Sequence, residues 1–296
     1  MNTLLPLVTV FGSLHYDITV HGPSRPRQGE TVTGTSWRPK CGGKGGNQAV
    51  AAARAGVRAA MIGVVGDDDF GETLLANLDS KGVDRRFVRI ASGCGSGMSV
   101  AIFDADGDYG AVIVSGANLT LSNMDLLAAD ELIYQTRILI VQNEVPEAAN
   151  ISAVRAVRAA GGRVMLNAAP ARKLSNELMG LVDILVVNAI EAEVLGEVSV
   201  VDSLTKAIGA ATILTGLCPA VVVTAGGAGV AFADREGHKI TLAAKQVKVE
   251  STHGAGDQFV GALAAAIANG FAVETALDVA NDAAAALVGT PESHRL

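Results

Sequence analysis

The sequence predicts an α/β protein with a doubly wound, mostly parallel sheet and a small antiparallel β-sheet lid. From about residue 130, apolar β-branched runs alternate with amphipathic stretches that have the length of crossover helices, at residues 148–160 and 203–214. Continuous apolar runs are typical of strands that helices cover on both faces, as in parallel sheets. The runs lie at residues 138–142, 164–167, 184–188 and 221–224.

The first third of the chain has a different pattern, in which apolar and polar residues alternate. The alternating segments are residues 18–20, 30–38, 99–104 and 110–115, with a helical stretch at 45–55 between them. Alternation predicts half-exposed antiparallel strands. We therefore expect a single domain over residues 1–296, with lid segments inserted at about 14–40 and 97–117.

Composition and charge exclude several classes of protein. Residues 1–10 are apolar but lack a basic segment and a cleavage site, so they predict a buried first strand and no signal peptide. The uncharged stretch at 258–273 falls short of the roughly 20 residues that span a bilayer. The net charge is −7, and no stripe of Lys and Arg could neutralise a nucleic-acid backbone. Three cysteines without CxxC spacing suit a reducing cytoplasm, so we expect a cytoplasmic protein with no membrane or nucleic-acid partner.

The strongest chemical signal is a glycine-rich segment at residues 253–257, directly before a helical stretch at 258–268. Gly254, Ala255 and Gly256 leave backbone N–H groups open to an anion, which the positive end of the helix dipole also attracts. Asp257 would then lie in the first helical turn, where a carboxylate can accept a proton from an attacking hydroxyl. A second interpretation stays open at this point, in which Asp257 only caps the helix.

A second glycine-rich segment, residues 41–48, leads into a helix at 49–55. It lacks the spacing of a Walker A loop and the Ser or Thr after its Lys, which disfavours a P-loop nucleotide hydrolase. Gly43, Lys44 and Asn47 could instead form hydrogen bonds with a polyol in a concave site. A plain turn before a helix is the alternative.

Asn188 and Glu191 follow the predicted strand at 184–188. The carboxyl ends of strands are where α/β sheets bind ligands, and Glu191 could hold a water molecule on Mg²⁺. A helix start rich in acids is the alternative interpretation of this segment.

Four residues with small side chains lie at the end of the strand at 221–224 or just after it, a position that suits a nucleotide phosphate: Thr224, Gly226, Gly227 and Gly229. The next segment, residues 230–233, has the pattern of a strand and not of a helix, so a dinucleotide-binding fingerprint is disfavoured. A strand-to-strand hairpin explains the glycines equally well.

Taken in order, these segments resemble the ribokinase family, the pfkB-type carbohydrate kinases, over nearly the whole chain. Residues 12–17 are similar to the family's first-strand sugar contact, and residues 188–191 to its Asn-x-x-Glu segment. Residues 42–48 and 251–259 resemble its two glycine signatures. Further segments similar to ribokinases are residues 29–34, 66–68, 116–118 and 167–172.

The resemblance implies a kinase that transfers the γ-phosphoryl group of MgATP to a hydroxyl, expected to be primary, of a ribose-like or other furanose sugar. Asp257 is implied to be the general base, the backbone N–H groups of residues 254–257 to stabilise the charge that develops, and Glu191 to assist Mg²⁺ through water. The implied substrate ligands are His15, Asp17, Gly43, Lys44, Asn47, Glu144 and Asp257. The implied ATP contacts are Asn188, Thr224, Gly226, Gly227, Gly229, Gly256 and Asn281.

The chain departs from the family pattern at three places. His15 stands where ribokinases usually have an Asn that contacts the sugar, which points to a changed substrate. Ser251 and Thr252 replace an Asp-Thr pair whose Asp contributes to a monovalent-cation site, so that Ser251 and His253 are the remaining candidate ligands. The sequence also ends soon after Thr290, where many relatives continue with a helix, so the last turn of the cation site is expected to be incomplete.

Three other functions stay open. A nucleoside kinase of the same superfamily would need an aromatic pocket, which Trp37, Phe103 and Tyr109 of the lid could supply. A sugar or nucleotide sensor could use the same fold without catalysis, although the intact segment 254–257 weighs against it. A dinucleotide oxidoreductase is disfavoured by the strand that follows Gly229. Separately, the exposed alternating strands of the lid predict a homodimer that pairs through them.

The replacement at position 251 predicts weak dependence on potassium, because a lost carboxylate removes a charge that would favour a bound K⁺ ion. Turnover measured at equal ionic strength in KCl and in NaCl should therefore differ little. A large activation by K⁺ over Na⁺ would refute this expectation.

Overall fold

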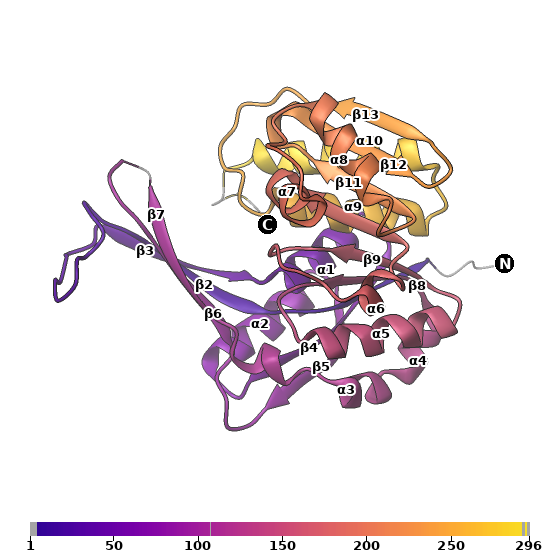
Figure 1. The fold of residues 1–296 in the computed structure, drawn as a ribbon. Helices are drawn as coiled ribbons and strands as arrows, with labels where there is room; N and C mark the ends of the chain where they lie inside the picture. Colours follow the sequence, from indigo (N-terminus) through magenta and orange to yellow (C-terminus); the bar gives the residue numbers. More distant parts are fainter. Residues whose placement is uncertain (1–4, 107, 292–293, 295–296) are drawn as a thin grey trace.

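The computed structural model describes residues 5–106, 108–291 and 294, and a nine-stranded sheet forms its centre (Figure 1). Part of the expected first strand, residues 1–4, lies outside the described residues. The strands, in sheet order, are β13 (Lys239–Ala243), β12 (Gly229–Asp234), β11 (Ala220–Thr224), β10 (Ile184–Asn188), β9 (Arg163–Asn167), β8 (Thr136–Gln142), β1 (Leu7–Phe11), β4 (Arg58–Gly66) and β5 (Asp84–Ala91).

The predicted doubly wound α/β fold is confirmed. The strands from β11 to β5 pair in parallel, and β12 and β13 are added antiparallel at one edge. The segment after β11 therefore forms a strand-to-strand hairpin, one of the two interpretations that the sequence allowed for its glycines. Strands β4 and β5 were not predicted. The edge strand β5 begins with three charged residues and contains Arg89, so it lacks the continuous apolar run that is typical of a parallel strand.

Helices cover both faces of this sheet, and alternate residues of each strand point to opposite faces. In β8, Ile138 and Ile140 contribute to one core, and Leu139 and Val141 to the other. The first core also contains residues of α1 (Lys44–Arg54), α2 (Asp69–Ser80), α9 (Ala255–Ala268) and α10 (Val273–Val288). The second contains residues of η1 (Gly116–Thr120), α3 (Asn123–Ala128), α4 (Asp130–Gln135), α5 (Glu147–Ala159), α6 (Asn176–Met179), α7 (Ala189–Gly196) and α8 (Leu204–Leu214).

Within the described residues, no helix is both long enough and apolar enough to cross a membrane.

A second sheet of four strands, which we call the lid, projects from the main body as a long arm (Figure 1). Its strands, in order, are β3 (Ser36–Gly42), β2 (His15–His21), β6 (Gly97–Phe103) and β7 (Tyr109–Val114).

Two expectations about the lid were wrong. Residues 30–35 form no strand, because β2 ends at His21, which pairs with Ser36; Thr35 still donates to the carbonyl of His21, but no described strand pairs with the residues before it. The lid is also not wholly antiparallel. β6 runs parallel to β2 because it enters the lid after a long excursion through α1, β4, α2 and β5, and not through a hairpin.

The pairing register gives the lid two different faces. Asp17 and Ser99 are directly paired and hydrogen-bonded, which places them on one face. Tyr16 lies on the other face, where its ring stacks on Phe70 of α2 at a centroid distance of 4.3 Å. Trp37 also belongs to this second face, beyond the part that α2 covers. The lid therefore has one apolar face and one face that carries Asp17 and Ser99 beside Phe103 and Ile113, which we call the polar face.

Helices α1 and α9 approach each other closely because Gly261 has no side chain. A Cβ atom at Gly261 would lie 2.5 Å from the Cβ of Ala51 and 2.6 Å from the carbonyl oxygen of Gln48. Such distances are far inside van der Waals contact, so the helix backbones themselves form this interface. The first turns of α1 and α9 are thereby held together, and both carry predicted site residues.

This contact predicts that Gly261→Ala destabilises the fold by roughly 1–3 kcal/mol, because the added methyl group overpacks the interface. Gly209→Ala is the matched control, since Gly209 lies in α8 and a Cβ atom on it would have no neighbouring atom within 4 Å. Alanine loses less backbone conformational entropy than glycine when a helix forms, so the Gly209→Ala variant should be more stable by about 0.5–1 kcal/mol. Urea unfolding of both proteins tests the pair, and equal effects would contradict the close contact.

Candidate active site

The site lies where the strand order reverses. β1 has β8 on one side and β4 on the other, and α/β sheets bind ligands in the crevice at such a switch point. Ser13 follows β1 and Glu144 follows β8, and the Ser13 hydroxyl donates a hydrogen bond to Glu144 Oε2. The same oxygen accepts a hydrogen bond of 2.9 Å from the backbone N–H of Lys44. One carboxylate thus joins β8, the segment after β1 and the start of α1.

A positive backbone angle starts α1 at this place. Gly43 has φ of +83°, and a Cβ atom on it would lie 2.7 Å from the backbone nitrogen of His15. Only glycine combines this conformation with this approach. The first turn of α1 is therefore seated on the segment between β1 and β2, and Lys44 and Asn47 reach the crevice.

His15 is buried beside this junction. Its ring nitrogen Nδ1 lies 3.8 Å from Glu144 Oε2, and its Nε2 lies 3.4 Å from the side-chain amide of Asn118. Asn118 also bonds to both the N–H and the carbonyl of Leu14, each at 2.9 Å. His15 is thus packed into the base of the lid, close to the predicted substrate ligand Glu144.

Asp257 lies in the first turn of α9, as predicted. Gly254 precedes this helix in the left-handed conformation, and no side chain caps the helix start. Asp257 Oδ2 accepts a hydrogen bond of 2.9 Å from Asn47, and Oδ1 accepts one of 2.9 Å from Gln48. Two consecutive residues of α1 therefore fix both oxygens of the carboxylate.

Gln48 is a residue whose role the sequence reasoning missed. Its Nε2 also donates to Asn167 Oδ1 at 2.9 Å, and its Oε1 accepts from Gln142 Nε2 at 2.8 Å. The side chains of Gln48 and Gln142 are fully buried. A buried amide of this kind keeps one orientation because every alternative leaves a polar group unpaired. The sequence did contain one signal for this role, which is the presence of a Gln among the glycines and alanines of an otherwise apolar helix.

A cavity of about 200 Å³, which we call the central cavity, opens between these elements. It lies at the carboxyl ends of β9, β10 and β11 and against the first turns of α1, α7 and α9. Its lining includes the predicted residues Lys44, Asn188, Glu191, Thr224, Gly254, Gly256 and Asp257.

Lys44 is the positive centre of this cavity. Burial favours its neutral form, but the surrounding carboxylates outweigh burial and hold the pKa of Lys44 above its ordinary value. Those carboxylates, in decreasing order of effect, are Asp257, Glu144, Glu191 and Asp17. The ammonium group is thus charged at neutral pH, and it faces the acids expected at a phosphoryl-transfer site.

Burial acts in the opposite sense on the acids. It raises the pKa of Asp257, an effect that Lys44 and the amides of Asn47 and Gln48 oppose. Burial also raises the pKa of Glu191, against the backbone N–H of Asn188 and the charge of Lys44. The ionised form of each acid is therefore a stronger base than an exposed carboxylate.

Asn188 and Glu191 form a reciprocal capping box at the start of α7. Glu191 Oε2 accepts from the backbone N–H of Asn188 at 2.8 Å, and Asn188 Oδ1 accepts from that of Glu191 at 2.9 Å. The alternative interpretation of this segment, a helix start, is therefore correct. Both residues also line the central cavity.

Several predicted ATP contacts lie outside the lining of this cavity. Gly226 and Gly227 form the short helix η2 (Gly226–Ala228) in the β11–β12 turn. Gly229 has φ of +123°, and a Cβ on it would lie 2.1 Å from the carbonyl oxygen of Leu242. The fold therefore requires glycine at this position whether or not the residue contacts ATP. Asn281 of α10 donates to the carbonyl of Ala243 at 2.8 Å.

The two candidate ligands of a monovalent cation, Ser251 and His253, lie in the segment before α9. The Ser251 hydroxyl accepts a long hydrogen bond of 3.3 Å from the backbone N–H of His253. Both residues precede α9 in the chain, and neither lines the central cavity.

Comparison with known proteins agrees with this arrangement. The model of the pfkB family carbohydrate kinases matches residues 5–295. A Bacillus subtilis ribokinase is 35% identical over 279 residues, which cover 94% of this chain and 91% of the relative. A deoxyribokinase of Salmonella typhi is 32% identical over 260 residues, which cover 87% of this chain and 84% of the relative.

A solved structure has the same architecture. Arabidopsis thaliana ribokinase complexed with ribose and ATP superposes with a TM-score of 0.89 at 30% identity, and the match covers 97% of this chain and 94% of the other. The chain therefore belongs to the pfkB family of carbohydrate kinases, and it is an ATP-dependent carbohydrate kinase.

Proposed function

We propose that this kinase transfers the γ-phosphoryl group of ATP to a primary hydroxyl of ribose or a similar furanose, with Asp257 as general base. The observation that carries the proposal is the fixed carboxylate of Asp257, held by Asn47 and Gln48 beside the uncapped start of α9. A proton acceptor next to an anion-binding helix start is the arrangement that phosphoryl transfer to an alcohol needs.

In this mechanism the substrate hydroxyl approaches Asp257, and its proton passes to a carboxylate oxygen. The backbone N–H groups of Gly254, Gly256 and Asp257 would stabilise the charge that develops on the transferred phosphoryl group, since the N–H of Ala255 already donates to the carbonyl of Thr252, and Lys44 adds a positive charge to the central cavity. Because these groups are already in place, little reorganisation is required during the reaction.

The residues of the central cavity also fit the divalent metal that accompanies ATP. Hard cations such as Mg²⁺ take oxygen ligands, and Glu191 presents a buried carboxylate at the cavity wall. Glu191 would hold Mg²⁺ through water together with the ATP phosphates. The ion, when bound, neutralises phosphate charge during transfer.

We assign the sugar to the space between the polar face of the lid and the start of α1. Asp17 is oriented there by the Ser99 hydroxyl, which donates to it at 2.5 Å. Asp17, Asn47 and the N–H groups near Gly43 offer the several fixed polar partners that a polyol requires. Glu144 supports this wall through the backbone of Lys44.

The names of the relatives support a free sugar. Ribokinases from several organisms match the chain at 31–36% identity, and one solved relative is described as complexed with ribose and ATP. The lid leaves the nucleoside alternative open, because Trp37 lies on the face opposite Asp17 but Phe103, which pairs with His21, lies on the face of Asp17. A deoxyribose remains a candidate acceptor because deoxyribokinases are also among the relatives.

The experiment that tests the function measures ADP release from MgATP with pentoses, ketohexoses, deoxysugars, polyols and nucleosides as acceptors. Turnover with one free sugar is the expected result. Turnover with nucleosides alone would refute the proposal, and ATP binding without any turnover would favour a sensor.

Asp257→Asn serves as the blank in that panel. It should lower kcat at least about 100-fold, because the amide cannot accept the hydroxyl proton. ATP affinity, measured by calorimetry, should change little because the backbone N–H groups of α9 remain. Near-normal turnover would remove Asp257 as the base.

The side-chain amide of Gln48 should affect the pKa of Asp257. Gln48→Leu removes a hydrogen bond that lowers the pKa of Asp257, so that pKa should rise further. A base must be ionised to act, so the acid limb of the pH profile of kcat/KM should move to higher pH, and turnover at neutral pH should fall about tenfold or more. Gln142→Leu is the control, since Gln142 contacts Gln48 but not Asp257. An equal shift in both variants would contradict the assignment.

We also propose a homodimer that pairs through the apolar face of the lid. Trp37 and Val112 lie on this face and are 64% and 68% exposed. Light scattering should give about twice the 30.1 kDa mass of one chain, and Val112→Asp should give the monomer. Leu127→Asp on α3, at a similar exposure of 67%, should leave the mass unchanged. A monomeric wild-type protein would refute the proposal.

A further inference from the structure

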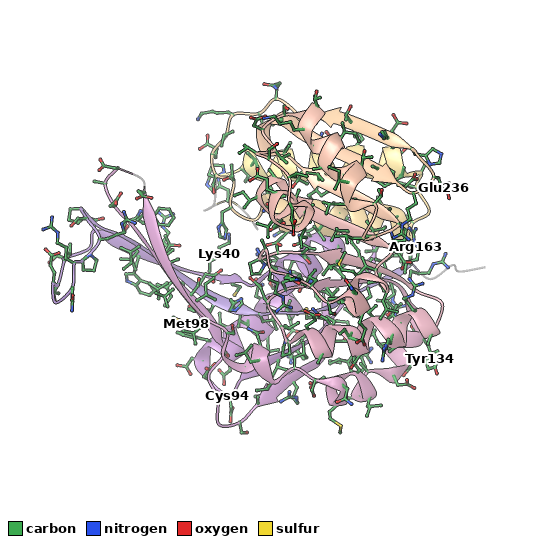
Figure 2. All side chains as sticks on the ribbon, in the orientation of Figure 1. Lys40, Cys94, Met98, Tyr134, Arg163 and Glu236 are labelled. Atoms are coloured by element: carbon green, nitrogen blue, oxygen red, sulfur yellow. The ribbon has the colours of Figure 1, made fainter. Side chains whose placement is uncertain are left out.

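Asn167 is the last residue of β9, and it lines the central cavity without a role in the function proposed above. The strand begins at Arg163, which Figure 2 shows on the side of the molecule away from Lys40 at the base of the lid, and it runs from there toward the site. Asn167 is 8% exposed, and a side chain this deeply buried needs partners for its polar atoms.

One N–H group of the Asn167 amide is left for a ligand. Asn167 Oδ1 accepts a hydrogen bond of 2.9 Å from Gln48 Nε2, and Asn167 Nδ2 donates one of 3.2 Å to the carbonyl oxygen of Val186 on β10. An amide nitrogen carries two hydrogens, and the second has no acceptor within the described residues. Because Asn167 lines the central cavity, this second N–H is the group that it can present to a bound molecule.

The carboxylate of Asp257 determines the orientation of this amide. An ionised carboxylate only accepts hydrogen bonds, so Gln48 must present Nε2 to Asp257. The same nitrogen donates to Asn167, which must therefore present its oxygen to Gln48, while Gln48 Oε1 accepts from Gln142. If the Asn167 amide were reversed, two N–H groups would face each other in a buried place. The N–H groups of Asn167 consequently point away from Gln48.

Asn167 also lies close to the proposed base. Asn167 Oδ1 and Asp257 Oδ1 each lie 2.9 Å from Gln48 Nε2, so these two oxygens are no farther apart than twice that distance. The sugar hydroxyl must reach Asp257, and the phosphorus atom that it attacks must lie next to the hydroxyl. Of the phosphate groups of ATP, the γ-phosphoryl group is therefore the one that comes nearest to Asn167.

We propose that Asn167 is a catalytic residue whose second Nδ2–H donates a hydrogen bond to an oxygen of the γ-phosphoryl group. The inference rests on the proposed role of Asp257 as the base. Ionised phosphoryl oxygens only accept hydrogen bonds, so they match an N–H group. As the bond from the γ-phosphorus to the departing ADP breaks and the bond to the sugar oxygen forms, the hydroxyl proton passes to Asp257. The amide of Asn167 then stabilises the charge on the phosphoryl oxygens.

The test compares the affinities of two nucleotides by calorimetry, each with Mg²⁺: a non-hydrolysable ATP analogue and ADP. Asn167→Asp keeps an oxygen for Gln48 but replaces the N–H group with a negatively charged oxygen. It should weaken binding of the analogue at least about tenfold more than binding of ADP, because only the analogue carries a γ-phosphate. A role confined to supporting Gln48 would leave the ratio of the two affinities as in the wild type.

Asn143→Asp is the matched control. Asn143 is 5% exposed, directly follows the neighbouring strand β8 and donates to the carbonyl of Pro170, but it does not line the central cavity. The same charge at this position should leave the ratio of the two nucleotide affinities within about threefold of the wild type. An equal fall of the ratio in both aspartate variants would overturn the proposal, because a general effect of charge would then explain it.

Asn167→Leu removes the donor without adding a charge, and it keeps the test decisive if the aspartate variant does not fold. Urea unfolding shows which variants are folded. In Asn167→Leu, kcat should fall about 10- to 100-fold while KM for the sugar stays within about threefold, because the lost N–H acts on the phosphoryl group and not on the sugar. Wild-type kcat in this variant would overturn the proposal.

The outcomes separate this inference from the proposed function. Near-normal turnover of Asp257→Asn would remove the base itself. An inactive Asp257→Asn, together with wild-type ratios of nucleotide affinity in the Asn167 variants, would remove the role of Asn167 alone.

Discussion

The close contact of α1 and α9 is the constraint on which the site depends. A side chain at Gly261 would overlap Ala51, and its absence lets the two helix backbones touch. The first turn of α9 then lies beside that of α1, where Asn47 and Gln48 each reach an oxygen of Asp257 at 2.9 Å. Hydrogen bonds weaken steeply with distance and angle, so a shift of about 1 Å between the helices would release the carboxylate.

Burial and charge act against each other around this carboxylate, and their balance makes it useful. Burial raises the pKa of Asp257, while Lys44 and the two amides favour the ionised form. Lys44 in turn stays protonated because Glu144 and Glu191 add to the charge of Asp257. The ionised carboxylate of Asp257 is therefore a stronger base than a solvated one, next to the place where an anionic phosphoryl group would arrive.

The lid contributes to both proposed recognition functions, the binding of the sugar and the pairing of two copies. Side chains alternate across a strand, so a single sheet presents Asp17 and Ser99 on one face and Tyr16 and Trp37 on the other. In the proposed function the polar face would close one side of the sugar site. The apolar face packs on Phe70 of α2, and a second copy would cover it farther out. Both proposed roles of the lid follow from one pairing register.

The sequence by itself determined β1 and the strands β8 to β11, although not β4 and β5, and it placed Asp257 in the first turn of α9, because apolar runs and a glycine segment before a helix are local patterns. Residues 30–35 were wrongly expected to form a strand, because alternation cannot show that β2 ends at His21, where its pairing with β3 stops at Ser36. The role of Gln48 was also hidden, since its partner Asp257 lies 209 residues away in sequence. Only the tertiary structure decides which amide meets which carboxylate, because such contacts depend on how closely two helices pack.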